Sequence, residues 1–146
     1  IGSGQNENKL KSFIKKNELT KIVKILEFKD NPYPIIKLSE LFVLTSKYEG
    51  LPNVLLESIV LKKFIISSDC PTGPKEILDY GKRGILFKVG SHRELTKKIL
   101  EYSKNKKKLR KKTKIAFNSL YKYDFKKNLN KYYFQIINLS WNYLSF

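Results

Sequence analysis

Two glutamates flank a tight turn near the middle of the chain, and their types and spacing could serve one ligand. Glu49 lies in the turn, and Glu57 lies about one helical turn beyond Asn53. A carboxylate accepts hydrogen bonds from sugar hydroxyls, whereas the free amides at the start of a helix suit a phosphate. Such a pocket fits a ligand whose hydroxyls flank a diphosphate, as in a nucleotide-sugar. On spacing alone, one turn-capping Glu and one solvated helix Glu is the simpler interpretation.

The residues around this pair predict the unit that positions it. Residues 41–44 form a short, uncharged apolar run, which is typical of a buried strand. Gly50 and Pro52 break the chain, and apolar residues from Asn53 onward indicate a helix that opens just past the proline. Ligands of open α/β sheets bind at the carboxyl ends of the strands, so both glutamates could face that edge.

Signals for helices and strands alternate along the first hundred residues. The expected elements are a helix ending near Asn17, a strand at 22–28, a short helix capped by Asn31, a strand at 64–67, a helix opened by Pro74, a strand at 84–89 and a helix capped by Ser91 with Glu94 three residues later. This alternation predicts an α/β domain with a parallel sheet flanked by helices. The loop at 69–74 is then expected on the same sheet edge as the turn at Gly50.

Four blocks occur in a characteristic order: LFVLTSKY, EGLPNVLLES, KKFIISSDCPTGPKEIL and GKRGILF. They resemble the retaining glycosyltransferases of family GT4, and more closely the branch that builds bacterial capsule, lipopolysaccharide and lipid-linked glycans. The resemblance covers residues 1–104 and implies the Rossmann-like, donor-binding C-terminal half of a GT-B fold. Residues 105–146 are expected to form a separate helical region of basic and aromatic character.

The resemblance also assigns roles to individual residues. Glu49 would contact the hydroxyls of the donor sugar as the catalytic carboxylate, and Glu57 would hold the ribose. Backbone amides between them would approach the sugar and the diphosphate; here they belong to Gly50, Leu51, Asn53, Val54 and Leu55. Pro52 has no amide hydrogen and cannot contribute one.

Other parts of the expected site come from elsewhere in the chain. Phe28 would lie beside the base, and Gly73, Pro74 and Glu76 would form the rim of the pocket. Family members also use an Arg and a Lys from the first β-α unit of the domain to neutralise the diphosphate, and a second domain to bind the acceptor. Both are expected upstream of these 146 residues, so this fragment should be inactive alone.

The resemblance implies a reaction as well as a fold. The donor is expected to be a UDP-sugar, the acceptor a glycan or a lipid-linked glycan, and the transfer to retain the anomeric configuration. No metal or other cofactor is expected. His92 has no Cys or carboxylate neighbours at ligand spacing, and the single cysteine, Cys70, cannot form an internal disulfide.

The charge of the chain suggests an alternative. It holds 30 Lys and Arg against 13 Asp and Glu, a formal net charge of +17. Residues 97–114 alone hold ten basic residues and one acidic residue. Such a balance predicts attraction to nucleic acid or to an anionic membrane, so the chain could be a non-enzymatic basic docking module. No specific nucleic-acid motif is present, and a compositional bias toward Lys and Asn explains the charge equally well.

Location and association complete the sequence-based expectations. The sequence shows no signal peptide and no apolar run long enough to span a membrane. We expect a cytoplasmic protein with peripheral contact to the inner face of the membrane. Residues 125–146 carry more aromatic side chains than one helical stripe can bury, so the chain is also expected to self-associate through them.

Overall fold

The computed structural model describes residues 4–131. The chain divides into two compact units, residues 1–38 and residues 39–146. The predicted boundary after residue 104 is therefore not where the chain divides. It lies inside one long helix, α5 (His92–Asn118), at a point where the helix kinks.

The first unit contains two helices joined by an extended segment. Helix α1 (Glu7–Lys16) has Asn17 as its C-cap, which confirms the predicted end near Asn17, and a Glu7–Lys11 ion pair of 2.6 Å supports its first turns. Helix α2 (Tyr33–Leu38) begins after Asn31, whose side chain accepts a hydrogen bond of 3.1 Å from the Tyr33 amide.

The strand predicted at 22–28 is wrong. Residues 24–28 form no strand, and the apolar side chains that suggested one are exposed, Ile22 by 80% and Phe28 by 69%. A run of β-branched and aromatic residues becomes a strand only when a neighbouring strand pairs with its backbone. Among the described residues no such partner is paired with this segment.

The second unit is built on a three-stranded parallel sheet, which confirms the predicted fold class. Strands β1 (Leu41–Leu44), β2 (Phe64–Ser68) and β3 (Ile85–Phe87) lie in the order β1-β2-β3. Leu44 pairs with Ser67, and Ser68 pairs with Phe87. Strand β3 is shorter than the predicted 84–89 because the amide of Lys88 donates to the Glu94 carboxylate at 2.9 Å instead of to a strand.

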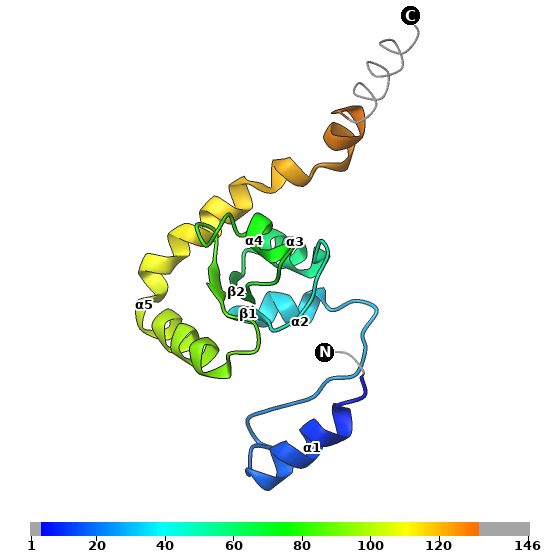
Figure 1. The fold of residues 1–146 in the computed structure, drawn as a ribbon, viewed down its shortest axis with the longest axis vertical. Coiled ribbons are helices and arrows are strands. Elements are labelled where there is room, and N and C mark those ends of the chain that lie inside the picture. The colour runs from blue at the N-terminus through cyan, green and yellow to red at the C-terminus, as the bar shows by residue number, and fades with distance from the viewer. Residues whose placement is uncertain (1–3, 132–146) are drawn as a thin grey trace, which may run out of the picture. The chain divides into compact units, whose positions relative to one another are not determined.

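Helices cover both faces of this sheet. Helix α3 (Asn53–Val60) and the single turn α4 (Pro74–Ile77) pack on one face, and the first half of α5 packs on the other. Figure 1 shows α5 curving around the strands. Because successive side chains of β2 alternate between the faces, every residue of β2 is buried.

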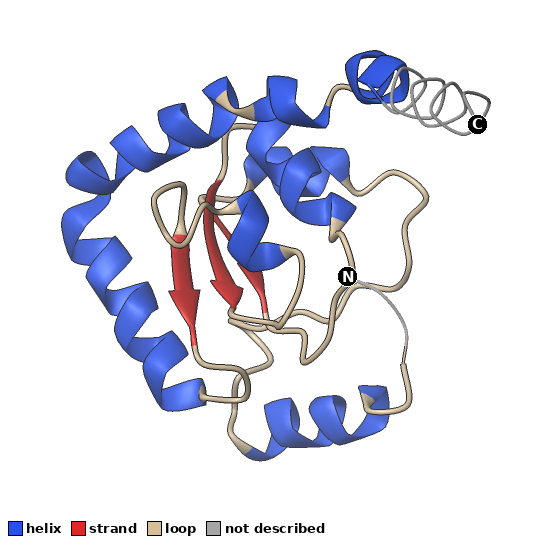
Figure 2. Cartoon of the chain, turned by 45° about the horizontal axis from the view of Figure 1, so that its top comes forward, coloured by secondary structure: helices blue, strands red, loops and turns tan. Residues whose placement is uncertain are grey.

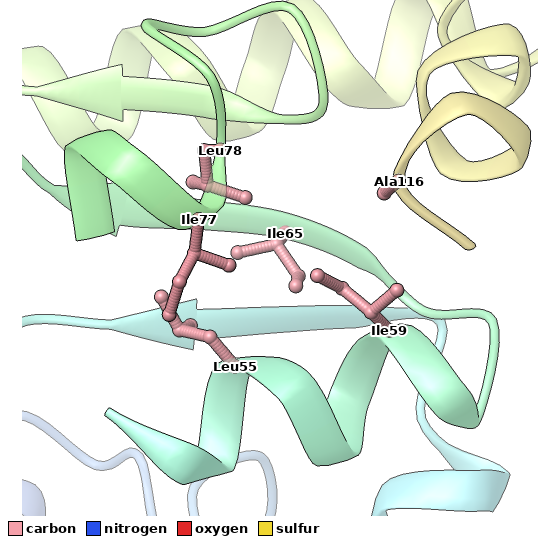
Figure 3. Packing of buried hydrophobic residues seen from close by; sticks show 6 residues of the cluster. All are labelled: Leu55, Ile59, Ile65, Ile77, Leu78 and Ala116. Carbon is pink, nitrogen blue, oxygen red and sulfur yellow. The ribbon is translucent and has the colours of Figure 1, made fainter. Parts of the chain in front are cut away.

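The core on the α3 face consists of aliphatic side chains that are 1% exposed or less. Figure 3 shows its six buried members: Leu55, Ile59, Ile65, Ile77, Leu78 and Ala116. The opposite core is partly aromatic, with Phe64 and Tyr102 stacked at 4.7 Å between ring centroids. Because buried side chains pack on both faces of the sheet, the strands and helices that carry the loops are fixed.

Helix α5 runs from the end of the sheet where the strands finish to the end where they begin (Figure 2). It begins after Ser91, whose side chain accepts a hydrogen bond from the Glu94 amide at 3.3 Å, as the predicted cap requires. Asn105 has non-helical angles (φ −120°, ψ 24°), and its side chain donates to the Glu101 carbonyl at 3.0 Å. Figure 2 shows α5 following the sheet and then turning across the ends where the strands begin.

The short 3-10 helix η1 (Leu120–Tyr123) follows α5, and helical turns resume at residues 125–131 after Asp124. The Asp124 side chain caps these turns by accepting from the Lys127 amide at 2.8 Å. None of the helices within residues 4–131 is long and apolar enough to cross a membrane. Most of the aromatic tail predicted to drive self-association lies outside the described residues.

Candidate functional site

The carboxyl edge of the sheet collects the loops that the sequence singled out. Parallel register places the ends of β1, β2 and β3 side by side, so the turn 45–52 and the loop 69–73 leave the sheet at neighbouring points. Both belong to the second unit. This is the edge at which open α/β sheets bind ligands.

Hydrogen bonds fix the turn 45–52 to the neighbouring loop. The Ser46 carbonyl accepts from the Ser68 hydroxyl at 2.6 Å and from the Cys70 thiol at 3.1 Å. The Glu49 carbonyl accepts from the Thr72 hydroxyl at 2.6 Å. Cys70 is fully buried and helps to hold this turn.

Gly73 brings the two loops into direct contact. Its φ of +83° lies in a region that residues with a side chain rarely adopt. A Cβ at this position would overlap the Gly50 carbonyl oxygen and lie 2.6 Å from Pro52 Cδ. The sequence placed Gly73 at the rim of a pocket, and the structure packs it against the backbone of the turn itself.

The two glutamates lie at either end of this turn. Glu49 is half-buried in the turn, and Glu57 is half-buried on the fifth residue of α3. Among the described residues neither carboxylate has an ion pair or a side-chain hydrogen bond. A half-buried carboxylate without a protein partner is available to accept hydrogen bonds from a ligand.

The amino end of α3 supplies donors between them. Pro52 is the N-cap residue, and no side chain caps the helix. The Leu55 amide donates to the Pro52 carbonyl at 2.9 Å, so it already has a partner, and the Leu55 side chain is fully buried in the core. This corrects the expected donor set, because the third helical amide reaches back to the N-cap. Asn53 and Val54 are the first two residues of the helix, and their amides have no acceptor within it.

The expected rim residues separate into two kinds. Pro74 is fully buried in the core and offers no surface to a ligand, which corrects its predicted place. Glu76 is exposed and is the third residue of α4. Gly50, Leu51 and Asn53 are exposed in or beside the turn. Phe28 belongs to the other unit, and its position beside a base stays a prediction.

Sequence reasoning missed one acidic residue at this edge. Asp69 directly follows β2, and its amide donates to the Phe87 carbonyl at 2.8 Å. One carboxylate oxygen pairs with Lys75 Nζ at 3.2 Å, while Oδ1 is buried without a hydrogen-bond partner among the described residues. Asp69 also lines a cavity of about 480 Å³ with Lys88 and Glu94. Its position at a strand's carboxyl end was the signal available.

Comparison with known proteins decides the family. The sequence profile described as glycosyl transferases group 1 matches residues 1–118. The chain belongs to this family. Its resemblance to GT4 enzymes is thereby confirmed, and so is the expected class of fold.

Relatives of this family cover different shares of the chain. An uncharacterized glycosyltransferase of Methanocaldococcus jannaschii is 41% identical over 101 residues, which are 60% of this chain and 25% of the relative. The N-acetylgalactosamine-N,N'-diacetylbacillosaminyl-diphospho-undecaprenol 4-alpha-N-acetylgalactosaminyltransferase of Campylobacter jejuni is 28% identical over 135 residues, 90% of this chain and 37% of the relative. The chain thus spans well under half the length of either relative.

A solved structure shows the same fold. A variant of S. aureus TarM, crystallised with fondaparinux, alpha-GlcNAc-glycerol and UDP, superposes with a TM-score of 0.80 at 24% identity. The match covers 90% of this chain and 27% of TarM. The chain therefore shares the fold of part of TarM.

Proposed function

We propose that the carboxyl edge of this sheet binds the donor of a retaining glycosyltransferase, a nucleotide-sugar with a diphosphate. The observation that carries the proposal is the pair of carboxylates, Glu49 and Glu57, that have no side-chain partner within residues 4–131 and flank a helix start without a side-chain cap. Carboxylates accept from hydroxyls, and helix amides stabilise a diphosphate. The layout matches a molecule with a sugar at one end, a ribose at the other and two phosphates between.

Each residue then has a defined task. Glu49 accepts hydrogen bonds from hydroxyls of the donor sugar, and Glu57 accepts them from the ribose. The amides of Asn53 and Val54 face the diphosphate, and Gly50 allows the sugar to approach the backbone of the turn. Glu76 is proposed to lie at the rim.

The proposed reaction needs no protein base at this edge. The bond from the anomeric carbon to the diphosphate breaks, and a bond to the acceptor oxygen forms on the same face of the sugar. The acceptor proton passes to an oxygen of the departing diphosphate. We therefore propose a transfer with retention that requires no metal or other cofactor.

The relatives support the proposed donor and acceptor classes. UDP was crystallised with the TarM variant, and the Campylobacter jejuni relative is named for a substrate on diphospho-undecaprenol. We propose a UDP-sugar donor, an acceptor on a glycan or lipid-linked glycan, and action in the cytoplasm at the inner face of the membrane. The acceptor-binding domain and the cations for the diphosphate are proposed to lie outside these 146 residues.

Titration with UDP tests the donor site. Glu57→Ala should weaken UDP binding by a factor of about ten or more, because a charge-assisted hydrogen bond contributes roughly 1.5–3 kcal/mol. Calorimetry should be run on this chain and on a chain extended upstream. Glu101→Ala is the matched control, since it removes one exposed carboxylate from α5. Equal UDP affinities for both variants in the extended chain would refute the assignment.

A further inference from the structure

A second recess lies at the opposite end of the sheet, where the strands begin, within the same unit. It has a volume of about 650 Å³ and lies between the second half of α5 and the residues at which β1 and β2 begin. This amino edge faces away from the strand ends that carry the candidate donor site. Figure 2 shows the second half of α5 crossing it.

The walls of this recess are strongly cationic. Five basic side chains line it and one carboxylate does; the basic residues are Lys62, Lys63, Lys106, Arg110 and Lys114. The carboxylate, Glu40, is held by Lys106 at 2.7 and 2.9 Å, which neutralises one cation. The hydrogen bond from Lys106, together with its positive charge, holds the pKa of the Glu40 carboxyl below its ordinary value. Four cations therefore remain in excess in one concave surface.

The cations other than Lys106 differ in the contacts that they make. Lys63 donates to the Ser39 carbonyl at 2.8 Å, and the Lys62 ammonium lies 4.9 Å from the centre of the Phe117 ring. Arg110 and Lys114, one turn apart on α5, have no ion pair or hydrogen bond from their side chains within residues 4–131. Like charges in a recess repel one another and focus a positive potential, which an anion relieves.

Three aromatic side chains also line the recess, together with Ser39, Thr113 and Asn118. The stacked rings of Phe64 and Tyr102 contribute to it, and the Tyr102 hydroxyl donates to the Glu40 carbonyl at 3.1 Å. Phe117 lies on the other side, beneath Lys62. Cations beside ring faces suit an anion that carries carbon, because the anionic group pairs with the cations while the organic part covers the rings.

We propose that this recess binds the phosphate group of an organic phosphate ester, with Arg110 and Lys114 as its principal contacts. The planar fork of an arginine matches two phosphate oxygens, and a lysine adds a point charge. Its volume is that of a site for a small molecule or a headgroup. The ester can come from a soluble phosphorylated compound or from a phospholipid headgroup. The proposal does not depend on the donor site, whose residues lie at the other edge.

Two probes distinguish the sources. Glycerol phosphate is titrated into the 146-residue chain and followed by NMR, and vesicles of phosphatidylcholine with and without phosphatidylglycerol are tested by co-sedimentation. Saturable binding of glycerol phosphate, with shifts at Lys62 and Arg110, supports a soluble ester. Binding only to vesicles that contain phosphatidylglycerol supports a headgroup. Failure of both probes overturns the proposal.

A charge-matched pair of variants separates a built site from a basic surface. Arg110→Glu with Lys114→Glu should weaken binding of the probe by about tenfold or more, the factor expected for a lost charge-assisted contact. Lys108→Glu with Lys111→Glu changes the net charge equally on exposed positions of α5 outside the recess, and should change binding less than about twofold. Equal losses in both pairs, or tighter binding to RNA than to either probe, would overturn it.

Two further variants keep the test decisive if the first pair fails to fold. Glu40→Gln should tighten binding, because it releases Lys106 toward the recess without removing a cation. Glu57→Ala should leave binding of glycerol phosphate unchanged, since it changes only the candidate donor site. Weaker binding in the first variant, or loss of binding in the second, would contradict a separate phosphate site.

Discussion

Gly73 offers the sharpest test of how the two loops support the candidate donor site. Replacing it with alanine introduces two separate costs. The backbone at φ +83° and ψ −76° is unfavourable for a residue with a side chain, which costs about 1–3 kcal/mol. The new Cβ also overlaps the Gly50 carbonyl and Pro52 Cδ, and such overpacking costs about 1–3 kcal/mol more. We expect Gly73→Ala to lower the free energy of unfolding by roughly 2–6 kcal/mol.

Gly81 provides the matched control. It has φ +91°, but a Cβ there would meet no heavy atom within 4 Å. Gly81→Ala should therefore show the backbone cost alone, about 1–3 kcal/mol. Both variants also lower the entropy of the unfolded chain to a similar degree, and that gain cancels in the difference.

Urea unfolding followed by far-UV circular dichroism measures both variants, and their unfolding slopes should match the parent's. Because Gly73 packs on the turn that carries Glu49, Gly73→Ala should also weaken UDP binding more than Gly81→Ala does. If the two variants differ by less than about 0.5 kcal/mol, the proposed packing of the two loops is refuted.

Three further expectations can be tested on the same chain. Lys112 Nζ donates to the carbonyls of Gly81 and Gly84 at 2.6 and 3.1 Å. Lys112→Ala should therefore cost about 1.5–3 kcal/mol of stability in urea unfolding, against less than about 0.5 for exposed Lys111→Ala. Burial raises the pKa of the Tyr102 phenol above its ordinary value of 10.0. The neutral phenol stabilises the folded chain fully below the tyrosine pKa of the unfolded chain, and this stabilisation is lost as pH rises through the pKa of the folded chain. The unfolding midpoint should therefore fall more steeply with alkaline pH than the midpoint of Tyr102→Phe does. Self-association through residues 125–146 should strengthen with salt, since screening reduces repulsion between basic chains; a monodisperse monomer in light scattering at every salt concentration would contradict it.

Local chemistry explains which elements the sequence predicted correctly. The strand at 41–44, the helix opening after Pro52 and the cap at Ser91 each depend on neighbouring residues, and all three are confirmed. The strand predicted at 22–28 failed because its formation depends on a pairing partner rather than on its own composition. Likewise, the hydrogen bond of the Leu55 amide and the burial of Pro74 depend on how the helices pack, which spacing in the sequence does not show.

The two edges of the sheet differ in how far sequence could reveal them. At the carboxyl edge, Glu49 and Glu57 lie within one continuous motif, so a single stretch predicted their neighbourhood. At the amino edge, Glu40 and Lys106 are 66 residues apart and are brought together by α5 as it bends at Asn105. The basic run at 97–114 predicted a charged helix, but its spacing alone does not indicate which strand ends the helix packs against. The same helix that begins beside the candidate donor site thus carries cations to the far end of the same strands, where a separate ligand can bind.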